Sequence, residues 1–255
     1  MSEASEVLLT TEYLNGKLEN NVITNWKFLN IKGNVKSKTV FNKFKKGFPY
    51  IVESVKCKGK LIYFTLFNEG GYVYILHNLK MTGVWREFDD DLSRWYIETE
   101  LGEKIWFSNV RTYSNIEFTD NEEYLSKELD KLGIDILTSE FTMKRWNEII
   151  KKNEKLNVTT FLMNQNIISG VGNHMKSEAL YYSKISPFRI MGNLTENEVS
   201  KLYEGIKIIP RISYNKRGMF GDEKEEDYKI YGKTSAKKSK TLDGYTTYWD
   251  PNVQK

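Results

Sequence analysis

The chain has 255 residues, of which 40% are hydrophobic, and carries a formal net charge of +4. This length allows one large domain or two smaller ones with real cores, and the composition excludes a disordered protein. So small a net charge does not by itself predict a nucleic-acid partner. The single cysteine, Cys57, excludes an intramolecular disulfide and a cysteine-based zinc site, and we expect it to be an ordinary strand or core residue. No apolar run is long enough to span a bilayer.

The first half of the chain is expected to be rich in β-strands. After a short helical window at 8–13, β-branched and aromatic residues recur in four runs that turn residues separate. These runs are residues 50–55, 61–67, 72–76 and 94–98. The sequence Asn-Glu-Gly-Gly at 68–71 predicts a hairpin turn between two of them, because glycine accepts a positive φ.

Near residue 133 the pattern becomes helical. Apolar residues recur at helical spacing after Trp146, and a further helix is expected to begin at Thr195. There, Thr195 and Glu198 have the spacing of a capping box. Residues 228–255 return to short aromatic runs around a polar turn, which predicts a small hairpin at the end of the chain.

The segment 159–180, TTFLMNQNIISGVGNHMKSEAL, has the most specific pattern in the chain. An apolar helix end leads into a tight turn at 170–173, Gly-Val-Gly-Asn, where a second helix is expected to begin. A helix start presents unpaired N–H groups and a positive dipole end, which suit a phosphate. A packing element without a ligand explains the same residues, and the residues alone leave both interpretations open.

This segment resembles the helix–two-turn–helix motif of the Fpg/Nei family of base-excision DNA glycosylases. The residues that match are Leu162, Gln165, Gly170, Gly172, Asn173, Glu178, Ala179 and Leu180. Six further stretches resemble the family in the same order along the chain. They are MSEASEV at 1–7, CKGKL at 57–61, LKMTGVW at 79–85, FSNVRTY at 107–113, LGID at 132–135, and DYKIYGK at 227–233 with GYTTYWDPNVQK at 244–255.

The resemblance implies an α+β fold with two domains. Residues 1–132 would form an N-terminal β-sandwich domain, and residues 133–255 a C-terminal helical domain with the helix–two-turn–helix motif. The latter would include a finger β-hairpin at about 226–255 that lacks the family's cysteines and therefore needs no zinc. We expect no cofactor, no metal and no membrane. The partner would be damaged or abasic DNA, duplex or single-stranded, bound by a monomer inside the cell, in the cytoplasm, the nucleus, or a viral factory or virion.

The resemblance also implies the catalytic residues. In the family, the free α-amine of the mature N-terminus attacks C1′ of the damaged nucleoside and forms a Schiff base, so removal of Met1 would expose the amine of Ser2. Glu3 matches the family's acid, and Glu6 matches a second acid near it. Lys60 matches a lysine on a hairpin next to the site. Without the rest of the chain, this N-terminus is an unremarkable acidic leader.

Other matching residues are expected to contact DNA. Lys155 and Asn173 would hold the DNA backbone, and Gly172 would begin the helix that does so. Met81, Arg111 and Tyr113 would fill the gap left by a flipped-out nucleotide. Lys233 and Tyr245 lie in the finger. By residue type alone, Met81 and Tyr113 are core residues, and the resemblance favours the DNA role.

Four departures from the family bear on activity. Ser2 replaces a proline, Asn109 an aspartate, Thr112 an arginine, and Tyr245 the arginine of the finger. Two hypotheses remain. The first is a bifunctional glycosylase and AP lyase acting on oxidised bases, with oxidised pyrimidines preferred over 8-oxoguanine. The alternative is a catalytically degenerate DNA-binding protein that serves in DNA packaging or as a structural subunit.

Overall fold

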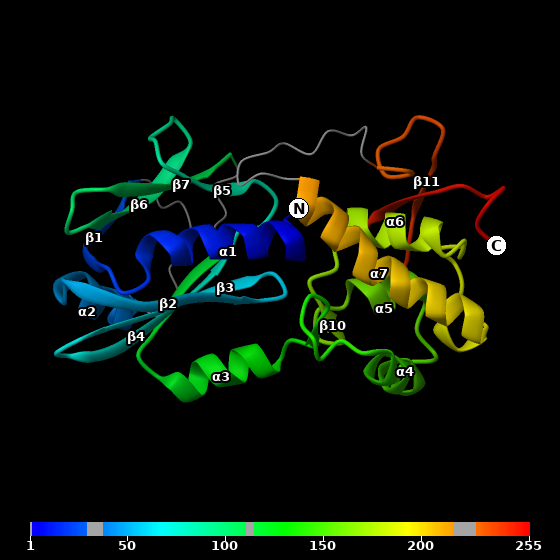
Figure 1. The fold of residues 1–255 in the computed structure, drawn as a ribbon, viewed down its shortest axis with the longest axis horizontal. Coiled ribbons are helices and arrows are strands. Elements are labelled where there is room, and N and C mark those ends of the chain that lie inside the picture. The colour runs from blue at the N-terminus through cyan, green and yellow to red at the C-terminus, as the bar shows by residue number, and fades with distance from the viewer. Residues whose placement is uncertain (1, 30–37, 111–114, 217–227) are drawn as a thin grey trace. The chain divides into compact units, whose positions relative to one another are not determined.

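The computed structural model describes residues 2–29, 38–110, 115–216 and 228–255 (Figure 1). These residues divide into two compact units. Unit 1 contains residues 1–2 and 6–131, and unit 2 contains residues 3–5 and 132–255. Three residues near the N-terminus therefore pack with the C-terminal part of the chain.

Unit 1 is built on an eight-stranded antiparallel sheet in the order β5-β7-β6-β1-β2-β3-β4-β8. Its strands are β1 (Val22–Phe28), β2 (Tyr50–Lys58), β3 (Leu61–Asn68), β4 (Gly71–Asn78), β5 (Gly83–Arg86), β6 (Ser93–Thr99), β7 (Lys104–Asn109) and β8 (Asn115–Thr119). The accompanying helices are α1 (Ala4–Leu18), α2 (Lys38–Lys46) and α3 (Glu122–Asp130). The first two residues of α1 belong to unit 2, and the rest of this helix belongs to unit 1.

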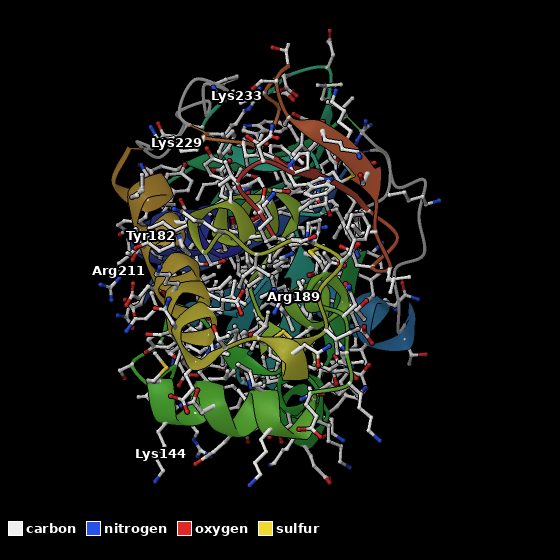
Figure 2. The ribbon with its side chains drawn as sticks, turned by 90° about the vertical axis from the view of Figure 1, so that its right-hand side faces the viewer. Lys144, Tyr182, Arg189, Arg211, Lys229 and Lys233 are labelled. Carbon is white, nitrogen blue, oxygen red and sulfur yellow. The ribbon has the colours of Figure 1, made fainter. Side chains whose placement is uncertain are left out.

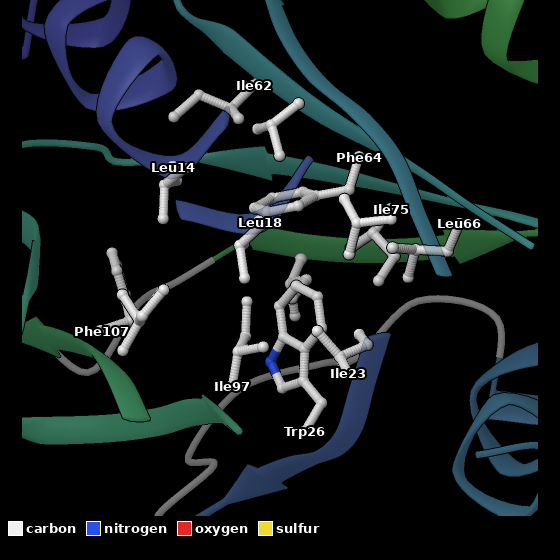
Figure 3. Packing of buried hydrophobic residues seen from close by; sticks show 14 of the residues in the cluster. Leu14, Leu18, Ile23, Trp26, Ile62, Phe64, Leu66, Ile75, Ile97 and Phe107 are labelled. Atoms are coloured by element: carbon white, nitrogen blue, oxygen red, sulfur yellow. The ribbon is translucent and has the colours of Figure 1, made fainter. Parts of the chain in front are cut away.

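The sheet folds over on itself into two layers (Figure 1). Its apolar side chains form one buried cluster. Figure 3 shows Phe64 and Ile75 on one side of this core and Trp26, Ile97 and Phe107 on the other. All five side chains are at most 2% exposed. The edge of the Trp26 ring meets the Phe64 ring at a centroid distance of 5.2 Å, a favourable geometry for two aromatic rings.

The strands expected from the first half of the sequence are confirmed as β2, β3, β4 and β6. The hairpin turn at 68–71 is also confirmed, because Asn68 pairs with Gly71 and Gly71 has a φ of +105°. The expected helix at 8–13 lies within the longer α1. The mixed composition of sheet and helices agrees with the predicted α+β class.

Unit 2 is mostly helical and includes two short strand pairs. Its helices are α4 (Met143–Lys152), α5 (Val158–Met163), α6 (Asn173–Tyr182) and α7 (Glu196–Lys216), with a 3-10 turn η1 (Met191–Asn193). Its strands are β9 (Ile134–Asp135) and β10 (Ile168–Ser169), which are parallel, and the antiparallel hairpin of β11 (Lys237–Lys240) and β12 (Thr246–Trp249). A buried cluster that includes Trp146, Phe161 and Leu180 holds the helices together.

The capping box expected at the start of α7 is present. The backbone N–H of Glu198 donates to Thr195 Oγ1 at 3.3 Å, and the backbone N–H of Thr195 donates to Glu198 Oε2 at 2.7 Å. Two helix-start groups are thus satisfied reciprocally. Across the described ranges, every helix is too short or too polar to cross a bilayer.

Candidate functional site

The carboxylate of Glu3 is buried at the start of helix α6. Its Oε1 accepts the backbone N–H of His174 at 3.0 Å, and its Oε2 accepts that of Met175 at 3.1 Å. His174 Nδ1 also lies 3.0 Å from Oε1. The first turn of a helix leaves N–H groups without intrahelical partners, and a negative charge there is favoured by the helix dipole. Glu3 therefore caps α6 across 171 residues of sequence.

Glycine at position 172 makes this approach possible. A Cβ at Gly172 would lie 2.2 Å from Glu3 Oε1, a distance that no side chain tolerates. The φ of Gly172 is −124°, so lack of space and not backbone conformation requires glycine here. At Gly170, by contrast, φ is +105° and a Cβ would also meet the Cβ of Ala4 at 2.7 Å. The two glycines of this turn thus allow a close approach, and the segment that approaches is the chain's own N-terminal segment.

The prediction of unpaired N–H groups at the start of α6 is wrong for two of them. Glu3 occupies the N–H groups of His174 and Met175, so these do not point to an external phosphate. Asn173 lies half-buried at the first helical position, and its Nδ2 donates to the carbonyl of Thr246 at 3.0 Å. An amide NH2 carries two hydrogens, so this bond uses only one of the two N–H donors of the Asn173 side chain.

Ser2 belongs to unit 1, where its backbone nitrogen donates to the carbonyl of Lys80 at 2.9 Å. Lys80 has a φ of +59°, a left-handed conformation that is uncommon for a residue with a side chain and concentrates at functional sites. Met81 follows directly and is 47% exposed, so it is not a core residue. The structure thus brings Ser2 to the loop that presents Met81.

The other expected residues lie on separate elements of the two units. Lys60 follows Gly59 in the β2–β3 turn, and Glu6 lies in the first turn of α1; both are half-buried. Lys155 is exposed between α4 and α5. Arg111 and Tyr113 lie outside the described residues, as does Met1. Within unit 2, Figure 2 shows Lys229 and Lys233 toward the top of the view and Lys144 of α4 at the bottom.

The β11–β12 hairpin is attached to helix α6. Lys176 Nζ lies 2.5 Å from Asp243 Oδ2 in the turn of the hairpin, and the two side chains are 0% and 2% exposed. Burial lowers the pKa of Lys176, while the hydrogen bond and the charge of Asp243 oppose that shift. Tyr245, 42% exposed, holds its ring centroid 5.9 Å from the same ammonium. The half-buried Lys233 lies in the turn before β11.

Glu178, on the same helix, organises the segment that leads into the hairpin. Its carboxylate accepts three backbone N–H groups in succession, at distances of 2.9, 2.8 and 2.7 Å. They belong to Lys229, Ile230 and Tyr231. The neighbouring rings of Tyr228 and Tyr231 pack against the His174 imidazole at centroid distances of 5.1 and 6.1 Å. This segment therefore packs against His174, which in turn contacts Glu3.

Sequence reasoning missed His174, Lys176 and Asp243. A signal for His174 was its position directly after Asn173 and the presence of only two histidines in the chain. No comparable signal paired Lys176 with Asp243, which lies 67 residues away. In the part of the chain that the structure describes, no group of three or more His, Cys, Asp and Glu side chains is arranged to hold a metal ion.

Comparisons with known proteins agree with this arrangement. Residues 132–217 match the H2TH domain of formamidopyrimidine-DNA glycosylase. The chain is similar to the formamidopyrimidine-DNA glycosylase of Wolbachia pipientis from Culex pipiens, with 30% identity over 220 residues that cover 81% of this chain and 76% of that protein. The same enzyme of Listeria innocua is 28% identical over 230 residues, covering 80% of this chain and 82% of its own.

Solved structures show the same fold. The structure of Lactococcus lactis Fpg in complex with DNA containing an abasic site has a TM-score of 0.85 and 20% identity, and the match covers 100% of both chains. A second Lactococcus lactis complex, with DNA containing an oxidised pyrimidine, has a TM-score of 0.85 and 19% identity over 99% of both chains. The whole described fold is therefore that of these proteins.

Proposed function

This chain belongs to the formamidopyrimidine-DNA glycosylase family, and on that premise we propose that it is a base-excision repair enzyme that removes oxidised bases from DNA and then cleaves the abasic strand. Its relatives carry the name of that enzyme. Solved structures of the same fold hold DNA with an oxidised pyrimidine or with carbocyclic 8-oxo-G, which supports oxidised bases as the substrate class. Within that class we propose oxidised pyrimidines as the preferred substrates. The DNA is damaged or abasic.

The proposed nucleophile is the α-amine of Ser2 after removal of Met1. An α-amine titrates near 8, about two units below lysine, so a useful fraction is uncharged at neutral pH. Its nitrogen attacks C1′, the bond from C1′ to the base breaks, and the base departs with a proton. The bond from C1′ to O4′ then breaks, the proton released by the amine goes to O4′, and a C1′=N Schiff base remains. Its electron-sink character permits loss of a proton from C2′ and cleavage of the C3′–O bond, which releases the 3′ phosphate.

The observation that carries this proposal is the position of Glu3. The residue directly after the proposed nucleophile is buried at the start of α6 and held there by two backbone N–H groups and an imidazole. A carboxylate oriented this firmly is suited to proton transfer beside the amine. Glu6 is proposed as the second acid, and Lys60 as the contact to the phosphate next to the lesion.

The remaining assignments concern DNA binding. We assign Asn173, at the Gly172 turn, and Lys155 to the backbone phosphates. The exposed Met81, with Arg111 and Tyr113, would fill the gap in the stack. Lys233 and Tyr245 would contact the strand from the finger. We place this work inside the cell, in the cytoplasm, the nucleus, or a viral factory or virion.

Borohydride trapping tests the chemistry. Protein whose N-terminus has been identified by mass spectrometry as Ser2 is incubated with duplex DNA carrying an abasic site or thymine glycol, and sodium borohydride reduces any Schiff base to a stable adduct. We expect a covalent adduct with both substrates. A preparation that retains Met1 is the matched control and should give none, because its Ser2 nitrogen is an amide.

The alternative, a DNA-binding protein without the chemistry, is favoured by one observation. At the tip of the hairpin, Tyr245 lies next to Lys176, whose charge is committed to Asp243. The turn residues 241–245 contain no arginine, so this tip lacks the guanidinium that gives a bidentate phosphate contact. Tight binding to abasic duplex without any adduct from Ser2-terminated protein would overturn the enzyme proposal and support a role in DNA packaging or as a structural subunit.

A further inference from the structure

We propose that His174 is a positioning residue: it orients the Glu3 carboxylate and sets the charge beside this carboxylate during removal of the base. The proposal rests on the glycosylase function above and deepens it. It begins from a contact in unit 2 that joins the N-terminal acid to the helix–two-turn–helix segment, where His174 Nδ1 lies 3.0 Å from Glu3 Oε1.

The geometry is specific for one carboxylate oxygen. The backbone N–H and the ring Nδ1 of His174 both reach Glu3 Oε1, each at 3.0 Å, while Met175 holds Oε2. The imidazole is 8% exposed and the carboxylate 2%. Polar contacts in such surroundings are stronger than in water, and three donors from two adjacent residues fix the plane of the carboxylate.

Two aromatic rings pack against the imidazole. The rings of Tyr228 and Tyr231 pack on it and lie edge to face with each other at 5.6 Å. A second charged group, the buried ammonium of Lys176, is in electrostatic contact with Glu3 and is itself paired with Asp243. Two groups beside Glu3 have ordinary titration ranges close to neutral pH: the imidazole of His174, at about 6.5, and the proposed α-amine of the adjacent Ser2, at about 8.

The hydrogen bond and the charge respond differently to pH. A neutral imidazole donates through Nδ1–H, and an imidazolium donates through the same atom while it adds a positive charge beside the carboxylate. Glu3 thus keeps its orientation in both states, but the cost of placing a proton on it changes. Departure of the base requires a proton, whereas Schiff-base formation at an abasic site has no base to expel. His174 should therefore affect the first process much more than the second.

Two substitutions separate orientation from charge. His174→Leu removes the ring donor and the charge, and His174→Gln keeps an N–H donor that does not titrate. Single-turnover rates of thymine-glycol removal are measured from pH 5.5 to 9, and borohydride trapping on abasic DNA is measured with the same proteins. Tyr228→Phe is the matched control, because it changes a neighbour of the imidazole and keeps the contact with Glu3.

We expect His174→Leu to remove the base at least about 10-fold more slowly, which is less than the roughly 100- to 10,000-fold contribution of a general acid–base group because His174 acts through Glu3. It should be trapped on abasic DNA within about 3-fold of wild type. His174→Gln should recover most of the rate and lose the part of the pH dependence that comes from the imidazole, at about 6.5, whereas the part at about 8 that comes from the Ser2 α-amine should remain. Tyr228→Phe should keep the wild-type pH profile.

The outcomes are distinguishable. Absence of trapping and of base removal in the wild type overturns the proposed function itself. With an active wild type, an unchanged pH profile in His174→Gln, or an equal loss of base removal and of abasic trapping in His174→Leu, overturns the role of His174. Thermal unfolding of each variant shows whether a loss comes from misfolding, and His174→Gln keeps the test decisive if His174→Leu is unstable.

Discussion

The ammonium of Lys176 and the carboxylate of Asp243 form an ion pair that is almost completely buried, with 2.5 Å between Nζ and Oδ2. Lys176 belongs to helix α6, and Asp243 to the turn of the β11–β12 hairpin. Asp243 Oδ1 additionally accepts the hydroxyl of Thr241 at 2.5 Å. Desolvating two charges is costly, and the cost is recovered only when both remain paired. This pair therefore fixes the hairpin to the helix.

Removing one partner should be worse than removing both. Lys176→Met or Asp243→Asn alone leaves a buried polar group without its partner, and we expect each to lower the free energy of unfolding by about 3 kcal/mol. The double variant should lose clearly less than the sum of the two. Urea unfolding at pH 7 measures all three. Additive losses would show that the two side chains do not stabilise the protein as a pair.

Gly172→Ala should displace Glu3. The new Cβ would meet Oε1 at 2.2 Å, so the carboxylate must leave the start of α6. We expect base removal to fall by about 100-fold, a value within the contribution of an oriented acid–base group. Gly16→Ala is the matched control: it lies in α1 with open space around its Cβ, and should stabilise the protein by about 0.5–1 kcal/mol without affecting activity. Wild-type activity in Gly172→Ala would contradict the role of Glu3.

Asn173→Ala and Lys60→Ala should weaken DNA binding without changing its sequence preference. Phosphate contacts contribute equally on every sequence, and loss of a charged contact lowers the slope of log K against log salt by about 1. We therefore expect weaker binding for both variants and a flatter salt dependence for Lys60→Ala. Fluorescence anisotropy on two unrelated abasic duplexes from 50 to 200 mM salt measures this. Lys127→Ala, which removes an exposed lysine paired with Glu123, should bind as wild type.

The capping box of α7 should make stability depend on pH. Burial tends to raise the pKa of Glu198, but hydrogen bonds from Thr195 and the charge of Arg189 outweigh it and hold this pKa below its usual range. A depressed pKa in the folded state stabilises the protein above the ordinary value of about 4.3 and ceases to do so as pH falls through the folded pKa. Glu198→Gln should therefore cost about 1 kcal/mol at pH 7.

The difference between wild type and Glu198→Gln should shrink as the pH falls below about 4. Chemical denaturation at several pH values checks this, with Glu196→Gln, in the same first turn, as the control. A constant difference from pH 7 to pH 3 would show that the carboxylate's charge does not contribute.

Local features of the sequence determined the local structure. The alternation of residues 50–76 and the two glycines at 70–71 predict two strands and their turn, because side-chain period and positive φ depend on neighbouring residues alone. Thr195 and Glu198 predict a helix start for the same reason. The glycines at 170–173 predict a tight turn, because glycine accepts a positive φ.

The tertiary structure decided which segment approaches. Glu3 occupies the N–H groups that the sequence left for a phosphate, and it reaches them across 171 residues. Lys176 and Asp243 are unremarkable lysine and aspartate in the sequence, and only folding makes them a buried pair. A contact between distant residues depends on closing the chain between them and on the packing of everything around it, neither of which a local pattern contains. The sequence therefore identified the motif, and the fold determined that its helix start holds the chain's own N-terminal acid.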